Sequence, residues 1–262
     1  MSEAIYRVDG DRFVPGLESR ATWYEEAQHG GPVAALLARE IEQVEVEAPM
    51  LITRLTVDLM RPVPVSPLRV QSRVIRHGRR IQVLEAQMSV DDVDVARASA
   101  LRIRIDEVGI PDQPGTDVPP SPDLSDPLTL EPAGERFFHT AAVEVRVAHG
   151  SFYEHGPAAA WFRLTMPIVE GEEPSPLQRT AAAADFGNGV SRVLGREYVF
   201  MNPDLTLHLH RHPVGEWVCL RARSDVEPDG IGLAQSELYD ERGRLGHALQ
   251  SLFVDTRERF GE

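Results

Sequence analysis

The sequence predicts an α+β fold made of two similar halves, each with one helix followed by a long antiparallel sheet. Two observations support this. A short segment recurs 150 residues further along the chain, and around each copy a helix-like pattern gives way to several strand-like runs. A repeat of this length indicates a duplicated domain, because solenoid repeats have periods of roughly 20 to 50 residues.

The repeated segment contains polar residues in its second copy that the first copy lacks. The first copy, Leu55 to Arg61, reads LTVDLMR, and the second, Leu205 to Arg211, reads LTLHLHR. A proline follows each copy within two residues. Because the two halves share a framework, the positions at which they differ are candidates for function.

The first half contains one predicted helix and four predicted strands. Residues 25–44 carry apolar residues at spacings of three and four, which is typical of a helix with one buried face. The period changes to two over residues 51–59, as in a half-buried strand. Further strand patterns, separated by the turn signals His77-Gly78 and Asp91-Asp92, occupy 68–76, 81–90 and 94–105.

A segment rich in Pro, Asp, Gly and Ser then interrupts the periodic pattern. Such a composition cannot form a helix or a central strand, so residues 108–135 are predicted to be a linker between domains 1–107 and 136–262. The second domain repeats the order of the first through Val254, with strand patterns over 141–147 and 158–167 and a helix over 177–194.

Composition limits the class of protein and its partners. The chain has 262 residues and one cysteine, Cys219, so no internal disulfide forms and a reducing compartment is favoured. The 41 acidic and 27 basic side chains give a net charge of -14, which opposes binding to nucleic acid or to an anionic membrane. No apolar run approaches the roughly 20 residues of a membrane span. We expect a cytoplasmic protein without nucleic-acid partners and without stable membrane insertion.

Several short motifs, taken in order, resemble those of a known family. They are Gln28-His29-Gly30-Gly31, Leu59-Met60-Arg61-Pro62, Ala184-Asp185-Phe186, His210-Arg211 and Ala248-Leu249-Gln250. Together they resemble the double-hotdog acyl-CoA thioesterases, the thioesterase II and thioesterase-like superfamily, over nearly the whole chain apart from the linker. The resemblance implies a tandem hotdog fold, in which each half is a long helix wrapped by an antiparallel sheet and the two sheets join side by side. It also implies an acyl-CoA substrate, no cofactor or metal, and a homo-oligomer.

The resemblance also implies a set of catalytic residues. In this family an aspartate on the second-half helix, a hydroxyl residue at the start of the following strand and a glutamine on the last strand activate water. Asp185 and Gln250 match the aspartate and the glutamine, whereas Asn202 stands at the hydroxyl position with Thr206 four residues later. An asparagine can both donate to and accept from water. We therefore expect Asp185, Gln250 and Asn202 to be catalytic and Thr206 to contact substrate.

The internal repeat supports this assignment independently of the resemblance. The 150-residue offset places Asp185 opposite Ala35 and Gln250 opposite Ala100. A helix face that accepts alanine in one half would lose several kcal/mol by burying a bare carboxylate in the other, unless that carboxylate is solvated or hydrogen-bonded. The asymmetry favours a site, and the alternative is an exposed helix carboxylate with a solvated strand amide.

Two further groups of residues are candidates for substrate binding. His29, Gly30 and Gly31 open the first helix, where unpaired backbone N–H groups could face a developing oxyanion or line a pocket. The alternative is an ordinary tight turn into the helix. The basic turn Arg76, Arg79 and Arg80 could meet the phosphates of coenzyme A, and its alternative is a solvated hairpin tip.

Other chemistries fit the sequence less well. It contains no G-x-S-x-G elbow and no P-loop. His208, His210 and His212 alternate along one strand, but no nearby carboxylate or cysteine completes a metal site, so a polar strand face is the better interpretation. Two alternatives remain open: a non-catalytic acyl or acyl-CoA-binding protein, which Asn202 makes credible, and a hotdog hydratase or dehydratase. The pattern of the latter places a histidine five residues after the aspartate, where this chain has Val190.

Overall fold

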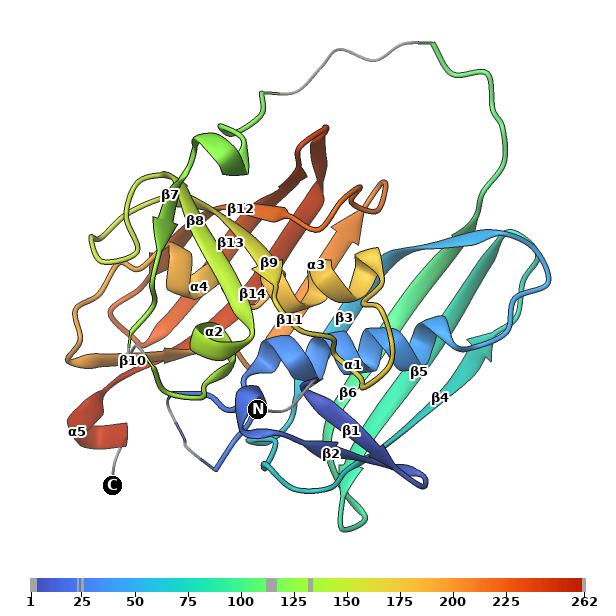
Figure 1. The fold of residues 1–262 in the computed structure, drawn as a ribbon, viewed down its shortest axis with the longest axis horizontal. Helices are drawn as coiled ribbons and strands as arrows, with labels where there is room; N and C mark the ends of the chain where they lie inside the picture. Colours follow the sequence, from blue (N-terminus) through green and yellow to red (C-terminus); the bar gives the residue numbers. More distant parts are fainter. Residues whose placement is uncertain (1–3, 23, 25, 112–116, 132–133, 261–262) are drawn as a thin grey trace.

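The computed structural model describes residues 4–22, 24, 26–111, 117–131 and 134–260. In this part of the chain, twelve strands form one large antiparallel sheet, and two central helices lie side by side against it (Figure 1). The order along the sheet is β4-β5-β6-β3-β11-β14-β13-β12-β9-β8-β7, and β10 pairs with β14. The first four strands of this order belong to the first half of the sequence and the others to the second half, so the two halves lie side by side in one sheet.

The elements of the first half follow the predicted ranges closely. They are α1 (Gly30–Glu42), β3 (Met50–Leu59), β4 (Arg69–Arg76), β5 (Ile81–Val90) and β6 (Val93–Arg104). The turn between β5 and β6 places Asp91 and Asp92 at φ angles of 48° and 63°, a left-handed conformation that aspartate tolerates better than most residues. A separate hairpin of β1 (Tyr6–Asp9) and β2 (Arg12–Pro15) precedes them, and so does a short helical turn, η1 (Leu17–Ser19). Neither was expected.

The second half contains the matching elements and some additions. Its helices are α2 (Phe138–Ala141), α3 (Pro176–Ala184), α4 (Gly187–Val190) and α5 (Arg257–Phe260). Its strands are β8 (Val143–His149), β9 (Ala158–Leu164), β10 (Tyr198–Met201), β11 (Asp204–Leu209), β12 (Val218–Val226), β13 (Ile231–Asp240) and β14 (Gly243–Thr256). In the order of pairing, β11, β12, β13 and β14 correspond to β3, β4, β5 and β6.

The two copies of the repeated segment pair with each other where the halves join. Strands β3 and β11 run antiparallel, with Thr56 directly opposite Thr206. These two residues are equivalent under the 150-residue offset, so an approximate two-fold axis passes between them. The neighbouring strands β6 and β14 follow the same 150-residue offset. Thr56 lies opposite Ser99 of β6, and Thr206 lies opposite the equivalent residue of β14, Leu249. The predicted tandem hotdog is confirmed.

The segment predicted to be a linker is partly structured. A helical turn, η2 (Pro122–Leu124), and a short strand, β7 (Asp126–Leu128), lie within residues 108–135. Strand β7 pairs with β8 at the outer edge of the sheet, a position that tolerates Pro127 because one side of an edge strand needs no ladder hydrogen bonds. The end of the predicted linker therefore belongs to the second half.

One continuous core joins the two halves. It includes six successive residues of α1, from Val33 to Ala38, and the α3 residues Ala181 to Ala184. Helix α1 packs against β4, β5 and β6, and α3 packs against β9 and β12, while the two helices also contact each other. The start of α1 is thereby held close to the end of α3.

The second central helix differs from the prediction of one helix over residues 177–194. Helix α3 ends at Ala184, and after a break the short helix α4 begins at Gly187. In the first half, α1 continues through Ala35, the position equivalent to Asp185. The chain therefore leaves the helical path at Asp185, which becomes the C-cap of α3.

Candidate active site

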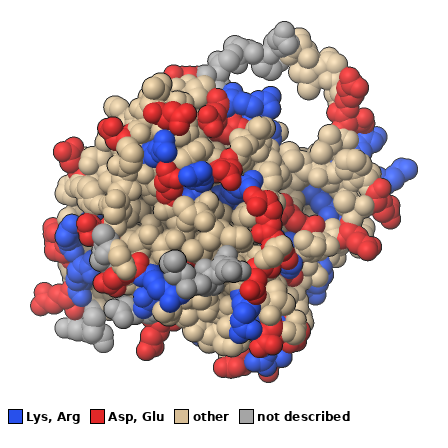
Figure 2. All heavy atoms as spheres, in the orientation of Figure 1, with Lys and Arg blue, Asp and Glu red and all other residues tan. Residues whose placement is uncertain are grey.

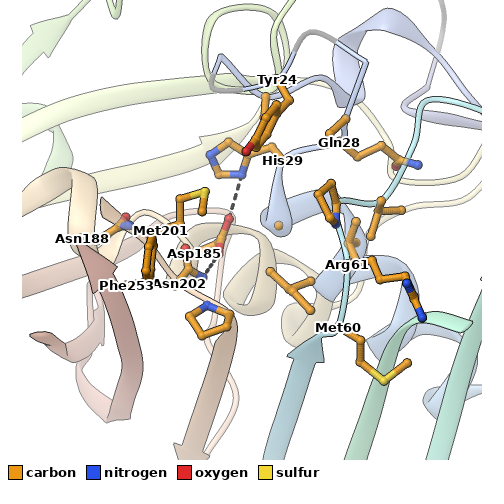
Figure 3. Close-up of a pocket in the computed structure, with 18 of the residues that line it drawn as sticks. Tyr24, Gln28, His29, Met60, Arg61, Asp185, Asn188, Met201, Asn202 and Phe253 are labelled. Atoms are coloured by element: carbon orange, nitrogen blue, oxygen red, sulfur yellow. Dashed lines mark hydrogen bonds and ion pairs between the residues drawn. The ribbon is translucent and has the colours of Figure 1, made fainter. Parts of the chain in front are cut away.

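Asp185 is a buried carboxylate, only 5% exposed, with polar partners on both oxygens. The Asn202 side-chain amide donates to Oδ1 at 2.8 Å, and His29 Nδ1 lies 2.8 Å from Oδ2. Figure 3 shows His29 and Asn202 pointing toward Asp185 from different segments of the chain. A buried carboxylate with such partners avoids the large cost of an unpaired charge.

The site is assembled from both halves of the molecule. His29 is the N-cap of α1 in the first half, whereas Asp185 ends α3 and Asn202 lies between β10 and β11 in the second. A β-carbon at Gly30 would stand 2.7 Å from both carboxylate oxygens of Asp185. Only glycine therefore allows α1 to approach so closely, which gives the glycine pair of the sequence a steric reason.

Two groups contact Nδ1 of His29. Nδ1 lies 2.8 Å from Asp185 Oδ2, and it accepts a hydrogen bond from the Gly31 N–H at 3.1 Å. A proton on Nδ1 would be donated to Asp185, since the carboxylate oxygen beside it can only accept. The ring packs against Phe138 and Phe186, at 5.1 and 5.0 Å between centroids. No residue in the described ranges forms a hydrogen bond to Nε2, which leaves this atom available to a substrate or a water.

The partners of Asp185 outweigh the effect of its burial. Burial alone would raise the pKa of this carboxyl. The charge of His29, when that ring is protonated, and the hydrogen bonds from His29, Asn202 and the Gly31 backbone lower it, and the net pKa of Asp185 is below its ordinary value. The carboxylate is therefore ionised at neutral pH.

Gln250 lies beside Asp185 but contacts its backbone. The side chain is 1% exposed, its Nε2 donates to the Asp185 carbonyl at 3.2 Å, and its Oε1 accepts from the Asn188 N–H at 3.1 Å. Gly187 leaves room for this amide, since a β-carbon there would lie 2.6 Å from Gln250 Oε1. Gln250 thus supplies hydrogen bonds at the break between α3 and α4 and holds Asp185 in place.

Two cavities meet at His29 and Asp185, which line both of them. We call the first the apolar cavity. It encloses about 290 Å³, and its largely apolar wall includes Val33, Leu59, Met60, Val63, Met201 and Phe253. The second encloses about 700 Å³ and shares Asn188 and Phe200 with the first. A reactive group held between His29 and Asp185 would therefore have space on two sides, of which one suits a hydrocarbon chain.

Comparison with known protein families identifies both halves of the chain. Residues 19–103 match the acyl-CoA thioesterase N-terminal domain, and residues 114–254 match the acyl-CoA thioesterase C-terminal domain. The chain belongs to the acyl-CoA thioesterase family. It is accordingly an acyl-CoA thioester hydrolase, as the sequence motifs predict.

Solved structures share the fold of this thioesterase over almost its full length. A Thermobifida fusca protein proposed as a thioesterase II is 17% identical, covering 97% of this chain and 96% of its own, with a TM-score of 0.75. A hot dog fold protein from Alicyclobacillus acidocaldarius is 19% identical, covering 96% of each chain, with a TM-score of 0.73. The tesB protein of Mycobacterium avium subspecies paratuberculosis is 15% identical, covering 95% of this chain and 94% of its own, with a TM-score of 0.69. None of the curated proteins compared matches the sequence.

Other predicted site residues of the thioesterase lie away from Asp185. Thr206 is at the junction of the halves, where its hydroxyl donates to the Thr56 hydroxyl at 3.3 Å. The basic turn, Arg76, Arg79 and Arg80, is exposed beside the start of β3, whereas the apolar cavity lies at the other end of that strand. A ten-residue strand is about 30 Å long. The structure therefore does not bring these four residues to the cavities.

The described residues of the thioesterase contain neither a metal-binding cluster nor a membrane-spanning helix. Among them, no group of three or more histidine, cysteine, aspartate or glutamate side chains is arranged to hold a metal ion. No helix in the same ranges is both long enough and apolar enough to cross a membrane.

The direct contact between His29 and Asp185 is the feature of the thioesterase that sequence reasoning missed. The sequence singled out both residues, but it assigned them to separate roles in separate halves. Their meeting depends on the packing of α1 against α3, to which neither segment gives a local signal. The glycines after His29 and after Asp185 were the available clue, since both mark a close approach.

Proposed function

We propose that this enzyme hydrolyses acyl-CoA thioesters with a water activated by the His29–Asp185 pair, and that Asn202 and Gln250 hold this pair in position. The supporting observation is the contact of 2.8 Å between His29 Nδ1 and the buried Asp185 carboxylate, at the place where two cavities meet. A base oriented by a second group is the arrangement that activates a weak nucleophile in many hydrolases.

The geometry favours His29 over Asp185 as the group that takes the proton. The motifs alone suggest Asp185, but a carboxylate whose pKa is below its ordinary value is a weak base near neutral pH. A neutral His29 that donates Nδ1–H to Asp185 keeps the lone pair of Nε2 for a water. Asp185 then orients the imidazole and stabilises the positive charge that develops on it.

The reaction balances with these groups alone. Water attacks the thioester carbonyl carbon while its proton passes to His29 Nε2, and the carbonyl oxygen becomes negative. When the tetrahedral intermediate collapses, the C–S bond breaks and His29 returns the proton to the coenzyme A sulfur. The products are a carboxylic acid and free coenzyme A. The apolar cavity would hold the acyl chain, because its wall is mostly hydrocarbon.

A thiol-release assay on a panel of acyl-CoAs of different chain lengths tests this proposal. We expect the wild-type enzyme to release coenzyme A. His29→Gln and Asp185→Asn should each lower kcat by roughly 10²- to 10⁴-fold, the range that general-base catalysis supplies. If His29→Gln keeps the wild-type kcat while Asp185→Asn loses activity, the base is Asp185. If acyl-CoA binds without thiol release by the wild type, the protein is an acyl-CoA-binding module.

The His29–Asp185 pair also favours one second candidate, a hydratase or dehydratase. The sequence lacks a histidine five residues after Asp185, but the structure supplies one from the other half. A dyad of this kind could move protons on an acyl chain without breaking the thioester. The ultraviolet absorbance of an enoyl-CoA incubated with the enzyme distinguishes the two reactions. Loss of that absorbance without release of thiol would favour the hydratase.

A further inference from the structure

The second cavity has a cluster of arginines on its wall. Arg192, Arg196 and Arg257 line it together with His29 and Asp185. We call it the arginine cavity. Arg192 lies just after α4, Arg196 lies before β10, and Arg257 begins α5. Figure 2 shows basic and acidic side chains side by side over the region of α5 and β10.

The three arginines concentrate positive charge in an acidic protein. The chain has a net charge of -14. Burial lowers the pKa of Arg192, and the positive charges of Arg196 and Arg257 lower it further, so the Arg192 guanidinium lies close enough to both to be repelled by them. Glu131 and Asp185 line the same cavity and add two negative charges to the three positive ones. Repulsion within such a cluster is relieved when an anion binds.

One hydrogen-bond donor of Arg192 is buried. Its Nε atom is inaccessible to solvent and has no hydrogen-bond partner among the described residues. Its guanidinium carbon lies 5.9 Å from the centroid of the Phe200 ring. An unpaired buried donor costs free energy, and groups of this kind are rare in folded proteins unless a ligand or a water completes them.

The backbone around the cluster is fixed by hydrogen bonds. The Arg257 Nε donates to the Arg196 carbonyl at 2.5 Å, and the Arg257 N–H donates to the Glu197 carbonyl at 2.9 Å. The Arg192 carbonyl accepts from the Gly156 N–H at 2.8 Å. These contacts tie the segment between α4 and β10 to α5, so the arginines are held together before any ligand arrives.

We propose that the arginine cavity binds the phosphate groups of coenzyme A, with the pantetheine arm leading from Arg196 and Arg257 at its exposed rim toward Asp185. Guanidinium groups match phosphate oxygens in geometry and charge. Because the pantetheine arm separates the phosphates from the thioester, a phosphate site must share a cavity with Asp185 yet lie apart from it. This inference rests on the proposed function, since it divides one substrate between the two cavities.

The basic turn predicted from the sequence is the rival site. Arg76, Arg79 and Arg80 are three arginines as well, but they lie at the end of the sheet away from Asp185. No described cavity that contains Asp185 includes any of them. A phosphate site must share a cavity with Asp185. The arginine cavity does so, because its wall includes both the three arginines and Asp185, whereas the basic turn does not.

Calorimetric binding of free coenzyme A to the full-length protein tests the assignment without relying on turnover. In Arg196→Gln/Arg257→Gln we expect the Kd to rise on the order of 10- to 100-fold, because the variant loses one or two charge-assisted hydrogen bonds to phosphate. Both residues are exposed, so the double variant should fold, and Arg192→Gln is measured beside it. The matched control is Arg7→Gln/Arg12→Gln, which removes the same charge from an exposed hairpin. An equal loss in both double variants, or none in the first, overturns the proposal.

A substrate without phosphates separates this inference from the proposed function. We expect Arg196→Gln/Arg257→Gln to raise KM for an acyl-CoA while leaving KM for the corresponding acyl-pantetheine unchanged, because only the first carries phosphates. If the wild type cleaves neither substrate, the proposed function fails, and the Kd values still decide where coenzyme A binds. If Arg76→Gln/Arg79→Gln/Arg80→Gln weakens coenzyme A binding and the cavity variants do not, the phosphate site is the basic turn.

Discussion

At the residue scale, the site depends on how one buried aspartate keeps its charge. A carboxylate that is 5% exposed normally favours its neutral form. Asp185 has donors from His29, Asn202 and the Gly31 backbone, and each of them is stronger when the acceptor is ionised. Asn202 stands where the family resemblance predicts a hydroxyl residue, and its amide donates a hydrogen bond to the carboxylate.

The stability that Asn202 contributes should therefore depend on pH. Because the folded pKa of Asp185 lies below its unfolded value of about 3.9, the ionised carboxylate stabilises the fold above that pH, and this stability is lost as pH falls through the folded pKa. Removal of the donor in Asn202→Ala should cost about 1.5 to 3 kcal/mol at pH 7 and less near pH 3. Urea unfolding across this range measures the difference. A cost that is the same at every pH would show that the partner is not an ionised carboxylate.

The sequence identified individual site residues better than their partners. Asp185 and Gln250 emerged from the family resemblance, the alanines at the equivalent positions of the first half supported them, and both are buried in the structure. The role of Gln250 could not be predicted in the same way. Its amide contacts the backbone at Asp185 and Asn188, and backbone contacts leave no trace in residue identities.

At the element scale, periodicity predicted the strands well and the second helix poorly. Strand β5 has the predicted bounds, because alternation of apolar residues is a local property of a half-buried strand. The break after α3 has a distant cause, since Gln250 on β14 supplies hydrogen bonds that the helix would otherwise make for itself. The first hairpin, β1 and β2, is too short for its period to be recognised.

The glycine at the start of α1 should be irreplaceable. In Gly30→Ala the new β-carbon would meet both oxygens of Asp185 at 2.7 Å, so α1 and α3 must move apart or the carboxylate must turn away from His29. We expect a loss of about 1 to 3 kcal/mol of folding stability, typical of overpacking, together with a large fall in kcat. Thermal unfolding and thiol release measure the two effects.

The other helix of the site provides the matched control for this substitution. A β-carbon at Gly189 in α4 meets nothing within 4 Å. Gly189→Ala should therefore raise stability by about 0.4 to 1 kcal/mol, because it reduces the freedom of the unfolded chain. Equal destabilisation by Gly30→Ala and Gly189→Ala would mean that the cost arises from a general intolerance of alanine and not from contact with Asp185.

At the scale of the whole molecule, the two duplicated halves contribute different residues to the site. The two-fold relation places Ala35 and Ala100 where the second half has Asp185 and Gln250. The first half instead contributes His29 and the start of α1 to the site of the second. The sequence revealed the repeat and the asymmetry. It could not show that the halves share a core and complete one site, because that depends on contacts between distant segments.

The shared core predicts that the chain can be cut between its halves without loss of the site. A protease recognition sequence inserted after Val108, which is 66% exposed, would allow cleavage of the folded protein. The β3–β11 ladder, the contact of α1 with α3 and the His29–Asp185 pair all cross the boundary, so the fragments should elute together and retain thiol release. After unfolding in urea, recovery of the cut protein should depend on its concentration, because association replaces the lost connection, while the uncut protein should refold independently of concentration. Separation of the fragments in native buffer would show instead that the halves are independent domains and that the single core is too weak to unite them.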